Sequence, residues 1–200
     1  MTATSYPIVV GGGGAGGGCG SPNNDNNGVN GNVSSFGGIS SAGGGQGKHG
    51  PCASQAGEPG GSGGGASGGN PGSRTGGTGN TPPVSPAQGN NGGSTGPWPA
   101  PSSFYYESAG GGGAGGAGGA SQPGPRAGGS GATTNITGSP VTYAAGGKGG
   151  TYVSPTTAIS NAPDNSGNGG DGKSTGPSGA PALAGANGGS GVVIIRYKFQ

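Results

Sequence analysis

The chain has 200 residues, of which 60 are Gly and 18 are Pro, and only 6% of the residues are charged. An ordinary globular domain contains about 7% Gly and about 25% charged residues. Leu, Ile, Val and Phe together contribute 19 residues. Burying one of these side chains contributes about 1.5–3 kcal/mol, but ordering the backbone costs roughly 1–2 kcal/mol for each of the 200 residues. Side-chain burial therefore cannot order this chain, which excludes helix bundles and doubly wound sheets.

The charge pattern excludes two classes of partner. Seven basic and five acidic residues give a formal net charge of +2, and the basic residues are mostly far apart. Nucleic-acid binding needs Lys and Arg clustered on one face, so we expect no nucleic-acid partner. No apolar stretch approaches the 18 residues of a transmembrane helix, so we expect no membrane insertion. The first ten residues also lack the basic and apolar regions of a signal peptide.

The first predicted element is a β-strand at Tyr6–Val10, with the sequence YPIVV. β-Branched and aromatic residues suit strands, and Pro7 restricts this one to a sheet edge or a strand start. The strand leads directly into the run Gly11–Gly18, with the sequence GGGGAGGG.

Glycine-dense runs like this one then alternate with Pro-, Asn-, Ser- and Thr-rich stretches along the whole chain. Collagen is excluded, because Thr81–Gln88 breaks its rule of Gly at every third position. The remaining ordered arrangement is a stack of polyglycine-II helices, which resemble polyproline II and have three residues per turn and no internal hydrogen bonds. Their N–H and C=O groups point outward and must find neighbouring helices, and Gly allows the close approach.

Four residues within the first 52 are candidates for structural roles. Cys19 and Cys52 could close a loop with a disulfide, or they could be two free thiols, because their spacing alone does not decide. Two Cys and one His cannot complete a four-ligand structural zinc site. Phe36 and Ile39, in the sequence SSFGGI, are expected to plug one end of the helix stack beside the terminal strands.

Two long polar segments, about 79–103 and 121–140, are expected to be exposed loops. The aromatic residues Trp98, Phe104, Tyr105 and Tyr106 lie in or next to the first. Such side chains are enriched in binding hot spots, so they are candidates for receptor contact. The competing interpretation is a small satellite core or a subunit contact.

The sequence contains short matches to cofactor-binding motifs, but the residues around them do not support such sites. Gly11, Gly13 and Gly16 match a dinucleotide-binding spacing after a predicted strand, but the residues that follow cannot form the helix that this site needs. Gly167–Ser174 matches a phosphate loop but has neither the preceding strand nor the following helix. His49 is the only His and has no recognisable triad around it. We therefore predict no enzyme activity, no cofactor and no metal site.

The last predicted element is a strand at Val192–Phe199, with the sequence VVIIRYKF. The two terminal strands hold seven of the fifteen Val and Ile residues, and we predict that they pair and close one end. The predicted fold is thus a single glycine-rich domain over 1–200. It is mostly irregular and all-β-like, with stacked polyglycine-II helices, a few short strands and no substantial α-helix.

These residues also carry a family resemblance. The leading strand into GGGGAGGG, the stretch SSFGGISSAGGG at Ser34–Gly45 and the closing GGSGVVIIRY at Gly188–Tyr197 resemble the glycine-rich domain of bacteriophage tail proteins. The alternation of Gly blocks with polar segments is also similar to the tip adhesins of T-even-like phage long tail fibres. Those adhesins stack polyglycine-II helices and contact the bacterial receptor through distal loops. From the sequence we expect no separate N-terminal attachment domain of the kind that those adhesins have.

The resemblance implies a non-enzymatic structural protein of the virion, at the tail tip or fibre end and made in the host cytoplasm. Its implied partners are other phage tail proteins, a bacterial surface receptor of protein or glycan, and further copies of itself as a homo-oligomer. An alternative is a self-assembling glycine-rich filament or coat protein without a receptor. An ice-binding polyproline-II bundle is a third alternative, against which the irregular loops argue.

Overall fold

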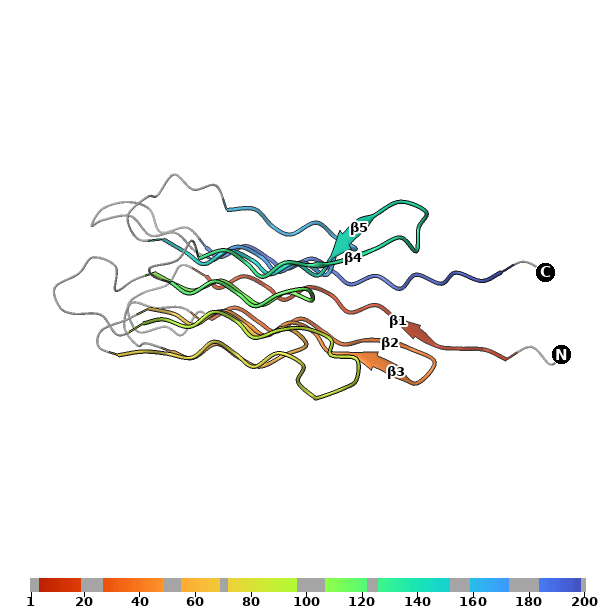
Figure 1. The fold of residues 1–200 in the computed structure, drawn as a ribbon, viewed down its shortest axis with the longest axis horizontal. Coiled ribbons are helices and arrows are strands. Elements are labelled where there is room, and N and C mark those ends of the chain that lie inside the picture. The colour runs from red at the N-terminus through yellow and green to blue at the C-terminus, as the bar shows by residue number, and fades with distance from the viewer. Residues whose placement is uncertain are drawn as a thin grey trace.

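The computed structural model describes residues 4–18, 27–48, 55–68, 72–96, 107–121, 126–151, 159–172 and 184–198. These residues form a rod in which the chain runs back and forth along the long axis (Figure 1). They include no helix, and therefore none long and apolar enough to cross a membrane. The predicted fold class is confirmed: the described chain is mostly irregular, with a few short antiparallel strands.

The strands make two small sheets. Strands β1 (Ile8–Val9), β2 (Ser34–Phe36) and β3 (Ile39–Ser41) form an antiparallel sheet in that order. Strands β4 (Ala132–Thr134) and β5 (Val141–Tyr143) form an antiparallel hairpin. Both sheets lie toward the end of the rod where the chain termini emerge, which we call the proximal end (Figure 1).

The rest of the described chain is held together by main-chain hydrogen bonds that repeat every three residues. In the run 108–114, the amides of Ser108, Gly111 and Ala114 all donate to the run 144–150. The amides of Ala109 and Gly112 donate to a second neighbour, and those of Gly110 and Gly113 to a third. Successive N–H groups pointing in three directions are typical of the threefold polyproline-II geometry. The runs therefore stack as the Gly content predicts.

Eight runs close into a ring. Each is hydrogen-bonded to the next, and the last is bonded back to the first. In ring order the runs are 11–17, 28–33, 42–48, 62–67, 108–114, 144–150, 167–172 and 185–191. The closing bonds are those from Gly185, Gly188 and Gly191 to Gly17, Gly14 and Gly11, at 2.8–2.9 Å. The runs 55–60, 74–79, 89–95, 116–121 and 126–131 pack against the outside of this ring.

The core consists of main chain rather than apolar side chains. Among the described residues, the buried hydrophobic side chains are only those of Ala66 and Ala109. Glycine is required where two runs touch: a Cβ added at Gly63 would stand 1.8 Å from the carbonyl oxygen of Gly77. Real Cβ atoms do not approach so closely, so a side chain there would force the runs apart.

The predicted pairing of the terminal strands is wrong. Strand β1 pairs with β2, through Ile8 opposite Phe36 and Val9 opposite Ser35. The described residues 192–198 are not in a strand and make no main-chain hydrogen bond to residues 4–10. The hydrogen bond between the chain ends that lies nearest to them runs from the Gly191 amide to the Gly11 carbonyl. Strand β2, which also pairs with β3 in a hairpin, occupies the edge of β1 that the C-terminal segment was expected to fill. Composition alone does not reveal this pairing.

The predicted loop boundaries also change. Residues 80–87 make a turn at the proximal end, but 88–96, inside the expected loop 79–103, form a run of the body. Gly89, Gly92 and Thr95 of this run are buried. Likewise, the expected loop 121–140 contains the run 126–131 and strand β4. Polar residues occupy the outward positions of these runs, which makes them resemble loops in composition.

Candidate interaction surfaces

The two ends of the rod differ in what they present. Reversals at 37–38, 60–62, 80–87, 114–116, 135–140 and 163–166 lie at the proximal end. The described segments that flank every internal gap instead reach the opposite end, which we call the distal end (Figure 1). Antiparallel partners such as Gly17 with Gly185, and Ser67 with Gln55, align these segment ends.

Trp98, Phe104, Tyr105 and Tyr106 lie outside the described residues, and so do Cys19 and Cys52. The aromatic residues fall between Gly96 and Glu107, and the segments ending there are both anchored at the distal end. The amide and carbonyl of Thr95 bond to Arg74 at 2.8 and 3.3 Å, and the Thr95 side chain is part of the buried body.

The other anchor of that gap is a buried ion pair. Glu107 is only 2% exposed, and its Oε1 lies 2.5 Å from Nη1 of Arg126, whose side chain is 22% exposed. Glu107 is the first described residue after the gap at 97–106, and Arg126 is the first after the gap at 122–125. The ion pair therefore joins the two segments that begin after these gaps. The sequence hid the pair because the two residues are 19 positions apart and neither lies in a charged cluster.

A second ion pair has the same placement. Nζ of Lys48 lies 2.6 Å from Oε1 of Glu58, and the Lys48 side chain is 10% exposed. Lys48 is the last described residue before the gap at 49–54. The described body thus fixes its distal end with charge pairs as well as main-chain bonds, and a partly buried charge needs such a partner.

Phe36 and Ile39 have different surroundings at the proximal end. Phe36 is half-buried, and its ring centroid lies 5.9 Å from that of Tyr6. Ile39 is 74% exposed on the edge strand β3. The predicted plug role is therefore wrong for Ile39, because the hairpin projects beyond the stacked runs instead of folding over them.

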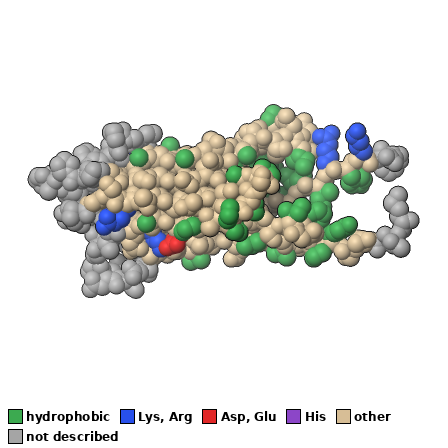
Figure 2. Space-filling view, turned by 60° about the horizontal axis from the view of Figure 1, so that its bottom comes forward, with side chains coloured by type: hydrophobic (Ala, Val, Ile, Leu, Met, Phe, Trp, Pro, Cys, Tyr) green, Lys and Arg blue, Asp and Glu red, His purple; other side chains and the backbone are tan. Residues whose placement is uncertain are grey.

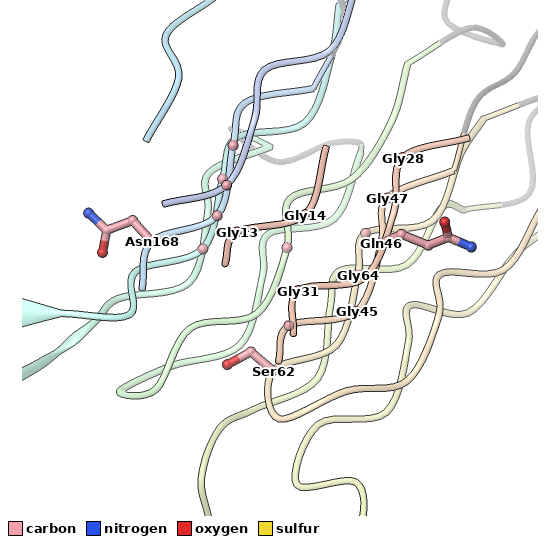
Figure 3. Close-up of a pocket in the computed structure, with 18 of the residues that line it drawn as sticks. Gly13, Gly14, Gly28, Gly31, Gly45, Gln46, Gly47, Ser62, Gly64 and Asn168 are labelled. Atoms are coloured by element: carbon pink, nitrogen blue, oxygen red, sulfur yellow. The ribbon is translucent and has the colours of Figure 1, made fainter. Parts of the chain in front are cut away.

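The ring of runs lines a partly open cavity of about 320 Å³. Figure 3 shows it in close-up, with Asn168 on one side and Gly31, Gly45 and Gly64 on the other. Its lining is mostly Gly main chain; the titratable residues among the lining residues are Lys48, Lys148 and Asp171. Lys48 pairs with Glu58, and Asp171 Oδ1 accepts a 3.0 Å bond from the Lys148 amide. The cavity therefore offers mainly main-chain polar groups.

The described residues contain no group of three or more His, Cys, Asp or Glu that could hold a metal ion. The features that distinguish this molecule are its two unlike ends.

A family model described as a glycine-rich domain matches residues 1–198. Comparison with the curated proteins and with the solved structures finds no match.

Proposed function

We propose that this chain, which belongs to the glycine-rich domain family, is a non-enzymatic structural protein of a bacteriophage tail, at the tail tip or fibre end. In this role the stacked runs are a rigid body, the distal end contacts a receptor on the bacterial surface, and the proximal end faces the virion. The phage assignment rests on the sequence resemblance of the Gly blocks and of the closing GGSGVVIIRY.

One observation supports assigning receptor contact to the distal end and virion attachment to the proximal end. The segments that flank every internal gap reach the same end of the body, away from both described termini. Recognition residues commonly sit in loops held by a rigid scaffold. The distal anchors Thr95 and Glu107 would hold the aromatic stretch of Trp98 and Phe104–Tyr106 in such a position.

The test is binding of the purified, fluorescently labelled chain to a panel of bacterial cells. Residues 97–106 are replaced by a Gly-Ser stretch of the same length, which leaves Thr95 and Glu107 in place. We expect the parent chain to bind some strains and the replacement to lose at least about tenfold in affinity, since aromatic hot spots each contribute about 2 kcal/mol or more.

The matched control is Ile39→Ser, which changes an exposed residue of the proximal end. We expect this variant to bind as the parent does. Equal binding by the parent and the 97–106 replacement would remove these aromatic residues from the contact. A parent chain that binds no cells would argue against the receptor role.

The alternative, a self-assembling filament or coat protein, is favoured by the exposed apolar residues at the proximal end. It predicts fibres whose length grows with protein concentration. A species of fixed mass at all concentrations would exclude it.

A further inference from the structure

The exposed large hydrophobic side chains of the described chain gather at one end. We call ten of them the proximal cluster: Tyr6, Ile8, Val9, Val10, Val33, Ile39, Val84, Val192, Ile195 and Tyr197, which are 37–80% exposed. Val29, on the body, is the one further large hydrophobic side chain of this kind among the described residues. Figure 2 shows hydrophobic side chains concentrated toward the end that carries the termini.

The segment 192–198 contributes three members of the cluster, and its main-chain N–H and C=O groups are unpaired among the described residues. After the 2.9 Å bond from the Gly191 amide to Gly11, its main chain makes no hydrogen bond to the described residues. The segment continues away from the body as an extended trace (Figure 1). Its composition is that of a strand, and an unpaired strand is a template for pairing with another chain.

The alternation of side chains gives this segment an apolar face. In an extended chain, successive side chains point to opposite sides, so Val193, Ile195 and Tyr197 share one face. Val192, Ile194, Arg196 and Lys198 share the other. Ile195 and Tyr197 are 54% and 80% exposed, so the apolar face is largely uncovered in the single chain.

We propose that residues 192–198 pair, in antiparallel register, with the same residues of a second copy, about a twofold axis at Ile195. A twofold interface uses the same patch on both copies and closes after two. The pairing supplies partners for the free main-chain groups and brings the two proximal clusters together. It is independent of the receptor contact proposed for the distal end.

The charges fit this register. With Ile195 opposite Ile195, Arg196 lies opposite Ile194 of the second copy and Lys198 lies opposite Val192. No basic residue then faces a basic residue, and like charges directly opposite would be destabilising.

The exposed apolar area of the proximal cluster approaches that of a stable interface. Eight aliphatic side chains and two Tyr, at the exposures of the proximal cluster, amount to about 500–750 Å² of apolar side-chain surface per copy. A standard stable interface buries about 800 Å² per partner. The main chain of the paired segments would supply the remainder.

Sedimentation of the full chain over a concentration series tests the proposal. We expect a species of twice the 18.0 kDa chain mass, and slowed amide exchange confined to 192–198 and its surroundings as the dimer forms. A single-chain mass at every concentration would overturn the proposal and point to a different protein as the occupant. Open-ended growth in mass would overturn the closed twofold pairing.

Two adjacent substitutions test the register. Ile195→Glu places two carboxylates opposite each other, so we expect the dimer dissociation constant to rise by about 100-fold or more. Ile194→Glu places each carboxylate opposite Arg196 of the second copy, so we expect less than about a tenfold change. Val29→Glu, at a similarly exposed residue outside the cluster, is the control and should leave the dimer unchanged. Equal weakening by the two Ile variants would overturn the register.

Discussion

The body and the proximal end of this protein solve the problem of stability in different ways. In the body, polar main-chain groups pair between neighbouring runs, and large side chains are excluded because each run approaches its neighbours too closely. At the proximal end, large apolar side chains lie on short strands, on a turn and on the extended segment 192–198, and they are mostly exposed. The apolar residues of this chain are therefore not its core. They are concentrated at the end of the rod that carries the described termini.

The largest expected effect comes from adding one methyl group inside the body. In Gly63→Ala, the new Cβ would stand 1.8 Å from a main-chain oxygen, and we expect a loss of about 3 kcal/mol in the free energy of unfolding. Gly47 is the matched control, because a Cβ there meets nothing within 4 Å. Gly47→Ala should be neutral or stabilising by up to about 1 kcal/mol. Urea unfolding of both variants measures the difference, and equal losses would contradict a body held by close main-chain contact.

The next effect concerns the distal ion pair. Glu107→Ala leaves Arg126 without its carboxylate partner, and we expect a loss of about 2–3 kcal/mol. This is less than for a fully buried pair, because Arg126 is partly exposed. The double variant with Arg126→Ala should recover part of the loss. Additive losses in this double-mutant cycle, followed by thermal or urea unfolding, would mean that the pair has no net coupling.

The smallest effect contrasts two buried hydroxyl groups. Ser67 Oγ accepts a 3.1 Å bond from the Gln55 amide, so Ser67→Ala should cost about 1 kcal/mol. Ser121 Oγ is buried and makes no hydrogen bond to the described residues. Ser121→Ala should therefore be neutral or slightly stabilising. The melting temperatures of the two variants should move apart, and a larger drop for Ser121→Ala would show that its hydroxyl has a partner.

The sequence was sufficient to predict the body but not its edges. Sixty Gly residues with few large side chains leave main-chain pairing as the remaining source of order, and that pairing is independent of the order of the runs. Which strands pair depends on contacts between distant residues, so the pairing of β1 with β2 was missed. The Glu107–Arg126 pair was hidden for the same reason.

The run 88–96 contains a sequence pattern that could have distinguished it from a loop. Its Asn, Ser and Thr content suggested a loop, but Gly89 and Gly92 are three residues apart and Thr95 continues the spacing. All three are buried. In a threefold helix, every third residue faces the same neighbour, so small residues at this interval distinguish a body run from a polar loop.

The back-and-forth course of the chain has a consequence for its capacity to change. Consecutive runs are registered by their own hydrogen bonds, so a peptide inserted between Gly68 and Gly72, or between Ser121 and Arg126, would leave the pairing of the body intact. Long insertions add little closure entropy. Several independent grafts would thus emerge side by side from one face, which makes the rod a natural platform for combinatorial display.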